Sequence, residues 1–434
     1  MAMATVTAME NRVKAIPLRS KKMTIYYLLL AAVVILGIPL CGKRCGSWGK
    51  IVYCIICAVG FIIISAIRFE VGYDYNSYGR ISYDMRVYDI EDVSLSRVEK
   101  GFLLPIYIIN LGFEEYYVVF IYTSIIIYTA VFALICKRSE IPWISAAAFL
   151  CFGLFFNSLC FLRQFIAALI IAYAIKFAHK ETIVRYLLLV IVASTFHWSA
   201  LIMAVMYIFV KIKPSWIYLG IVTAGTVIFC IFSRSAMLFL IDKFYMYKSY
   251  DPDNNPEASM GLPPRYTIMF GIIFLICFLF RKKLIEKNPD NGIYINCLMF
   301  TVVFEAMGMR HAILSRFAIL TYLPPCLFML PDTAAIIGHW IKDKKGKVFE
   351  ILSATAASIF AVGCYTVLMI NNYNGVVPYV TQFNRTHDIF LDNVILEEDT
   401  DSNDEEEDYN DNEDHEDYDE DSEEIFIENL PISQ

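Results

Sequence analysis

The sequence predicts an all-α fold, a polytopic bundle of about 10–12 membrane-spanning helices with an extracytoplasmic loop and re-entrant or broken segments. Hydrophobic residues make up 58% of the 434 residues and charged residues 18%, whereas a soluble domain has roughly 45–50% apolar and ~25% charged residues. Much of the charge also lies outside the apolar part. Residues 397–428 hold 20 acidic side chains and no Lys or Arg, and removing these 20 charges from the formal net charge of −8 leaves +12. We therefore expect a cationic body embedded in a membrane.

The chain divides into three parts. Residues 1–22 form a basic N-terminal extension, residues 23–380 the membrane domain, and residues 381–434 an acidic tail. We expect the tail to be disordered, because its like charges repel one another and it has little apolar surface to bury. No G-x-G-x-x-G or P-loop motif indicates a soluble nucleotide-binding domain.

Ten apolar stretches of the membrane domain approach the length of about 20 residues that a span needs. They are residues 23–41, 50–67, 117–136, 142–157, 159–179, 216–232, 266–280, 292–308, 317–330 and 348–370. Residues 185–211 form either one long span or two short segments that meet at His197. Short loops rich in Lys and Arg are typical of the cytoplasmic side. The short basic loops of this chain all lie on one side of the membrane only if residues 185–211 enter the membrane and return to the side from which they came. This favours two segments, although the basic N-terminus then lies outside, against the rule.

The resulting topology places a loop at residues 68–116 on the extracytoplasmic face. The loop opens with RFEVGYDYNSY at 68–78, in which Gly72 permits a sharp backbone turn. The three tyrosines of this stretch offer flat faces with hydroxyl groups, which suit packing on sugar rings. Residues 101–113 contain Pro105 and are too short to span, so we expect an amphipathic or re-entrant segment at the interface.

Arginines near the outer face are the main candidates for a binding site. Ionisable side chains in or beside spans are costly and therefore mark function, and the topology places Arg68, Arg163, Arg310 and Arg316 at one level. Guanidinium groups bind phosphate in bidentate fashion, which predicts an anion clamp. The plainer interpretation is an interfacial arginine whose charged head reaches water. His197 could likewise be a packing histidine.

The other chemistry-bearing residues have structural interpretations. Most of the 12 cysteines lie in apolar runs, where cysteine acts as a small hydrophobe. The C-x-x-C at 54–57 has no second pair, and D-P-D at 251–253 lies among prolines and asparagines that favour a turn. We expect neither a metal nor a cofactor.

Six motifs follow one another in a fixed order. They are R-x3-G-x-D-x3-Y at 68–78, E-x-G-F at 99–102, L-R-Q-x-I-A at 162–167, F-H-x-S-A-L at 196–201, S-R-F at 315–317 and V-V-P-Y at 376–379. As an ordered set over about residues 23–380, they resemble the EpsG family of bacterial polysaccharide polymerases, which are similar in role to Wzy-type polymerases. The basic extension and the acidic tail depart from the pattern expected of that family.

The resemblance implies a multi-pass glycosyltransferase of the inner (cytoplasmic) membrane with an extracytoplasmic active site. It would polymerise undecaprenyl-diphosphate-linked repeat units into exopolysaccharide or capsule, with membrane lipid and a chain-length regulator as partners and no nucleic acid. A flippase for lipid-linked sugars, an O-antigen-type ligase and a non-catalytic sensor or scaffold remain the alternatives.

Roles follow from this chemistry. A departing diphosphate needs its negative charge stabilised, for which Arg68, Arg163 and Arg316 are candidates with Arg310 in reserve. Tyr78 and Gln164 complete the expected substrate-binding set, and the base is His197, Asp74 or Glu99. No matched pair of carboxylates suggests a covalent intermediate, so we expect inversion at the anomeric carbon by a single displacement.

Overall fold

The computed structural model describes residues 23–42, 45–87, 98–113, 115–178, 182–243 and 261–384. Over these ranges the regular elements are helices, and one isolated antiparallel β-bridge joins Arg68 to Thr381. The predicted all-α class is confirmed. The N-terminal extension, the predicted turn at 251–253 and the tail from residue 385 onwards lie outside the described residues.

The protein is a multi-pass membrane protein. Among the described residues, 6 helices are long and apolar enough to cross a membrane, or up to 8 if each of 2 bent helix pairs is one span. The six are Met23–Leu40, α2 (Gly46–Ala66), α6 (Val118–Arg138), α16 (Asn291–Gly308), Ala312–Lys345 and α19 (Lys347–Ile370). Four shorter apolar helices are α5 (Lys100–Asn110), α10 (Ile183–Ser194), Trp198–Val210 and α14 (Arg265–Leu279). Several stretches expected as full spans are therefore shorter or broken helices.

The remaining elements are short or lie at the ends of spans. The helical stretch Ala312–Lys345 consists of η5 (Ala312–Arg316), α17 (Phe317–Pro324), the short π-helix η6 (Pro325–Met329) and α18 (Leu330–Lys345). Other elements are α3 (Tyr75–Val87), η1 (Ile175–Phe177), α12 (Trp216–Ile231), α13 (Ser233–Lys243), α15 (Arg281–Lys287), η7 (Tyr373–Gly375) and η8 (Gln382–Asn384).

One span is broken by a glycine. Helices α7 (Pro142–Cys151) and α8 (Leu154–Cys160) meet at an angle of 61°. Gly153, between them, has φ +84°, a left-handed conformation that glycine adopts without a steric penalty. The chain then turns again at Phe161 into α9 (Leu162–Ala174), so two helix ends lie inside the bundle.

The predicted break at His197 is confirmed. Helix α10 ends at Ser194, and η3 (Trp198–Leu201) followed by α11 (Ile202–Val210) begins just after His197. The two segments run back along each other, because Tyr186 donates a hydrogen bond to the Met203 carbonyl at 2.7 Å and its ring lies 5.5 Å from that of Tyr207. The chain therefore enters and returns, as the distribution of basic loops indicated.

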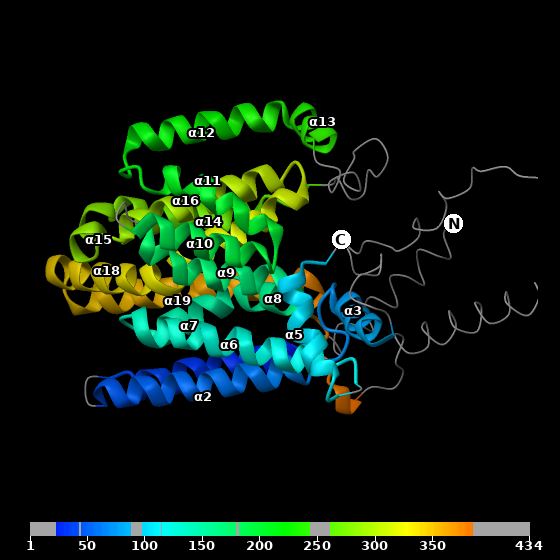
Figure 1. Cartoon of the computed structure of the whole chain (residues 1–434). Helices are drawn as coiled ribbons and strands as arrows, with labels where there is room; N and C mark the ends of the chain where they lie inside the picture. Colours follow the sequence, from blue (N-terminus) through cyan, green and yellow to red (C-terminus); the bar gives the residue numbers. More distant parts are fainter. Residues whose placement is uncertain are drawn as a thin grey trace, which may run out of the picture.

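The loops gather at two ends of the bundle (Figure 1). At the end we call the basic end, Lys50 donates to the Ser139 carbonyl at 2.6 Å and the Arg281 guanidinium lies 5.4 Å from the centre of the Trp216 ring. The opposite end, which we call the loop end, carries α3 and α5 (Figure 1). The short basic loops and the loop that contains α3 therefore lie at opposite ends of the bundle.

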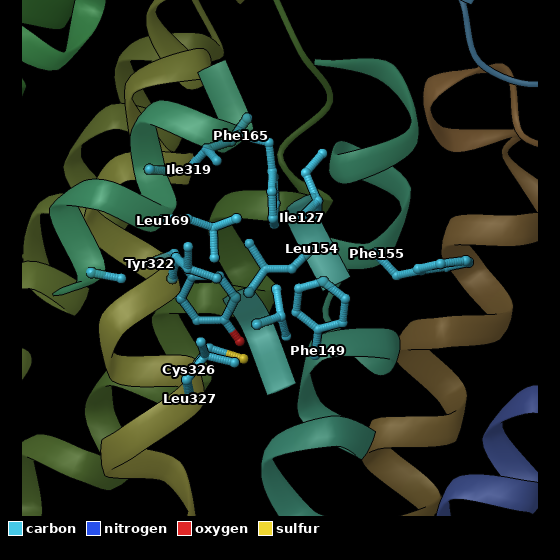
Figure 2. Close-up of a cluster of buried hydrophobic side chains, with 14 of the residues drawn as sticks. Ile127, Phe149, Leu154, Phe155, Phe165, Leu169, Ile319, Tyr322, Cys326 and Leu327 are labelled. Carbon is cyan, nitrogen blue, oxygen red and sulfur yellow. The ribbon is translucent and has the colours of Figure 1, made fainter. Parts of the chain in front are cut away.

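The apolar core joins the broken span to its neighbours. Phe149 and Leu154 from α7 and α8, Phe165 from α9 and Tyr322 from α17 are all at most 2% exposed and lie together in Figure 2. Cys326 is buried in the same cluster, and all 12 cysteines are free thiols. The core thus fixes α8 and α9, whose ends carry the candidate site.

Candidate functional site

Glu99 is the centre of the polar cluster at the loop end. It precedes α5, and its side chain is only 5% exposed. Its Oε2 accepts a hydrogen bond from Arg163 Nη1 at 2.5 Å, and its Oε1 contacts His197 Nδ1 at 2.9 Å. The same Oε1 accepts the backbone N–H of Trp198 at 3.1 Å. One carboxylate therefore joins the start of α5, the start of α9 and the break after α10.

The surroundings of Glu99 keep it ionised. Burial by itself raises the pKa of Glu99, but the hydrogen bond with His197 and the positive charge of Arg163 outweigh it and lower the pKa to about 2. An ionised carboxylate only accepts hydrogen bonds, so His197 Nδ1 carries a proton and donates it to Glu99. This leaves His197 Nε2 as the ring nitrogen that can take a proton from a substrate.

The E-x-G-F motif has a steric explanation. The Gly101 N–H donates to the Thr195 carbonyl at 2.9 Å, and a Cβ at Gly101 would lie 2.5 Å from that oxygen. Only glycine allows α5 to approach the end of α10 this closely. Phe102 is fully buried with its ring 5.6 Å from that of Tyr78. The motif thus holds Glu99 against the segment that carries His197.

Asp74 is a second carboxylate with a different environment. Burial raises the pKa of Asp74, while the charges of Arg316 and Arg163 and a hydrogen bond with Cys160 act in the opposite direction without cancelling that effect. Asp74 and Glu99 therefore have pKa values shifted in opposite directions. Such a divergence is typical of sites in which two carboxyl groups have separate roles.

Arg163 and Arg316 come from distant parts of the chain, and both lie near enough to Asp74 to lower its pKa by their charge. The Arg163 side chain, in the first turn of α9, is 25% exposed. Arg316 ends η5, and its guanidinium lies 5.1 Å from the centre of the Phe161 ring. Gln164, 3% exposed, donates to the Arg316 carbonyl at 2.9 Å and to Ser199 Oγ at 3.2 Å. Gln164 is therefore placed to position this region, with little surface of its own for a substrate.

Arg68 does not present its guanidinium to the site. It is fully buried, and its Nη1 donates to the Ser65 carbonyl and hydroxyl at 2.6 and 2.7 Å. Its Nη2 donates to the Leu159 carbonyl at 3.1 Å, in the last turn of α8. That turn leaves carbonyls without helical partners, so Arg68 fixes the α8–α9 break. The guanidinium of Arg68 is therefore bonded to protein acceptors at the end of α8, and the clamp role expected of it from the sequence stays a prediction.

The structure separates the other expected site residues. Tyr78 is 5% exposed, and its hydroxyl lies 3.5 Å from the Arg163 backbone nitrogen. Tyr75 is buried and stacks on Phe120 with ring centres 4.1 Å apart, whereas Tyr73 is 39% exposed. Arg310 is exposed in the turn before η5. The site therefore combines Asp74, Tyr78, Glu99, Arg163, Gln164, His197 and Arg316, with Arg310 on the surface and Arg68 beneath.

Sequence reasoning missed some residues of this end. Arg265 donates to Asn371 Oδ1 at 2.7 Å and to the Tyr266 hydroxyl at 3.3 Å. Arg265 directly precedes the apolar stretch at 266–280, and this position could have marked it as a candidate, because ionisable residues beside spans often have a function. Ser199, the acceptor of Gln164, lies in the F-H-x-S-A-L motif at 196–201, although the sequence did not show which side chain it contacts. Among the described residues no group of three His, Cys, Asp or Glu could hold a metal ion.

Comparison with protein families decides the classification, because the EpsG family model matches residues 50–381. The chain belongs to the EpsG family. Membership assigns it to membrane polysaccharide polymerases of the glycosyltransferase kind. The match encloses every site residue of this EpsG protein from Asp74 to Arg316 and ends at Thr381, the bridge partner of Arg68. No curated protein and no solved structure matches the chain.

Proposed function

We propose that this EpsG protein polymerises undecaprenyl-diphosphate-linked oligosaccharide repeat units into exopolysaccharide or capsule. The observation that carries the proposal is the grouping of Arg163, Arg316 and Asp74 beside a His197 that an ionised Glu99 orients. This grouping supplies both cations for a diphosphate and a base for a sugar hydroxyl.

The arginines would bind the donor. Arg163 uses Nη1 for Glu99, which leaves Nη2 for a phosphate oxygen. Arg316 approaches from η5 and would take a second oxygen. Guanidinium groups stay charged and give directional hydrogen bonds to phosphate. The negative charge that develops on the departing diphosphate is stabilised most strongly in a site with little water.

His197 would act as the base. The acceptor hydroxyl transfers its proton to Nε2 of His197 while its oxygen attacks the anomeric carbon of the donor. The bond from that carbon to the diphosphate oxygen breaks, and the diphosphate leaves with the electron pair. Asp74 is the alternative base. Its position near both arginines suits it equally to hold the acceptor hydroxyl by a hydrogen bond, and the displacement is inverting in either case.

The site would face the extracytoplasmic side of the inner membrane. The basic loops lie at the end of the bundle opposite to α3 and α5 (Figure 1). Basic loops are retained on the cytoplasmic side, which supports an outward-facing loop end. Exposed Tyr73 beside Asp74 would then offer its ring to a sugar of the glycan.

Reconstituted protein supplied with lipid-linked repeat units tests this function. We expect a ladder of polymer on a gel, with release of undecaprenyl diphosphate for each bond formed. Translocation of the lipid-linked glycan without new glycosidic bonds would make the protein a flippase. A single transfer to a different acceptor would make it a ligase.

A further inference from the structure

A cavity of about 520 Å³ lies at the basic end, far along the bundle from the candidate site. It opens between α15 and α18, which lie close together in Figure 1. Its lining includes Lys283 and Lys287 of α15 and Ile336, Trp340 and Lys344 of α18. No step of the proposed polymerisation uses these residues.

One of the lysines is already neutralised. Lys287 forms ion pairs with Glu140 and with Asp332, the latter at 3.2 Å. These carboxylates hold α15 against α18 and the end of α6. Asp343 also lines the cavity, but among the described residues no carboxylate lies within 4.0 Å of the ammonium of Lys283 or Lys344. Within the part of the chain that the structure describes, these two ammonium groups therefore have no ion-pair partner.

The same two lysines converge on one aromatic ring. Lys283 Nζ lies 5.9 Å and Lys344 Nζ 5.4 Å from the centre of the Trp340 ring. The indole is held in place by an edge contact with Phe280 at 5.7 Å. Like charges brought to one ring repel each other, and an anion between them would remove that repulsion. The electron-rich face of the indole attracts both ammonium groups and holds them on one residue, where a single anion can bind to both.

The surroundings identify the kind of anion. Tryptophan and lysine together are typical of the boundary between headgroups and hydrocarbon. Ile336 gives the cavity an apolar wall, and Val348, Phe349 and Ile351 at the start of α19 are more than half exposed at the same end. A soluble phosphate would gain nothing from these apolar contacts. We infer that Lys283 and Lys344, positioned by the Trp340 ring, bind the phosphate of an anionic phospholipid whose acyl chains lie along α18 and α19.

Lipid retention by the full-length protein tests this inference. Protein is reconstituted in nanodiscs of phosphatidylcholine with phosphatidylglycerol, extracted in mild detergent and examined for bound lipid by native mass spectrometry. We expect wild-type protein to retain phosphatidylglycerol in preference to phosphatidylcholine. Each lost lysine charge is expected to lower this preference about fivefold, so Lys283→Gln with Lys344→Gln should lower it roughly 25-fold.

A matched control removes two charges from the same end. Lys342 and Lys347 are exposed and do not line the cavity, so Lys342→Gln with Lys347→Gln should keep the preference. Equal loss in both double variants, or no loss in the first, would overturn the site. Displacement of the lipid by soluble glycerol phosphate at equal concentration would overturn the assignment to a phospholipid. Thermal unfolding in phosphatidylcholine shows whether each variant is folded.

Discussion

Replacing Glu99 by Gln removes the charge at the centre of the site while keeping its shape. The amide oxygen of Gln can still accept the N–H groups of Trp198 and His197. It cannot pair with the positive charge of Arg163 or hold the imidazole with the strength of a carboxylate. The Glu99→Gln variant therefore isolates the electrostatic contribution of this residue to catalysis and stability.

The expected magnitude follows from the pKa of Glu99. Burial opposes ionisation, yet His197 and Arg163 lower the pKa from 4.5 to about 2, which corresponds to about 3 kcal/mol in favour of the ionised form. Because the folded pKa is the lower one, this stabilisation is complete above pH 4.5 and is lost as the pH falls toward 2. After a discount for solvent screening, we expect Glu99→Gln to lower the free energy of unfolding by about 2 kcal/mol at neutral pH. Polymer formation should also slow, because an amide holds the His197 imidazole less firmly than a carboxylate does.

The assay is the initial rate of polymer formation at neutral pH, with thermal unfolding measured between pH 3 and pH 7 as a second readout. Glu115→Gln is the matched control, since Glu115 is an exposed carboxylate shortly after α5. A Glu99→Gln variant that polymerises within twofold of wild type would refute the argument. So would an acid dependence of stability that is unchanged by the substitution.

Three further predictions test separate parts of the account. Gly101→Ala places a Cβ 2.5 Å from the Thr195 carbonyl and should cost about 1–3 kcal/mol of stability, seen as a lower melting temperature. Asp74→Asn should abolish polymerisation yet melt at or above the wild-type temperature at neutral pH. Burial raises the pKa of Asp74 despite the two arginines, so its contribution to stability falls as pH rises above the ordinary pKa of 3.8. Tyr73→Ala should raise KM for the glycan roughly tenfold while leaving the protein folded.

Two of these variants have matched controls. Gly112→Ala should be tolerated, because the nearest atom to its Cβ lies 3.9 Å away; equal melting temperatures for both glycine variants would contradict the packing argument. Tyr107 is as exposed as Tyr73, at 41% against 39%, so Tyr107→Ala should leave KM unchanged. An Asp74→Asn variant with normal activity would remove Asp74 from the site.

The class of fold could be predicted because hydropathy and the placement of basic loops are properties of short stretches. The basic loops also predicted the break at His197, which the structure confirms. Hydropathy could not show that Gly153 breaks a span, since one left-handed glycine changes the path without changing the composition. Helix lengths were therefore overestimated for stretches that end inside the bundle.

The site could be predicted by residue type but not by arrangement. Glu99 and Arg163 are 64 positions apart, and only the approach of α5 to α9 brings them together. Arg68 had the sequence features of a clamp residue, yet its guanidinium turns inward to the Leu159 carbonyl. No sequence pattern distinguishes exposed Tyr73 from buried Tyr75, because the turn that separates them depends on contacts with residues 374 and 375.

The most direct test of the central claim compares polymer formation by wild-type protein and by Arg163→Lys, with Arg86→Lys as an exposed control at the same end. Lysine keeps the charge of Arg163 but loses the two-pronged hydrogen bonding to Glu99 and phosphate. We predict a polymer ladder for wild type and for Arg86→Lys, and almost none for Arg163→Lys. A full ladder from Arg163→Lys would contradict the claim that this guanidinium holds the lipid-linked diphosphate.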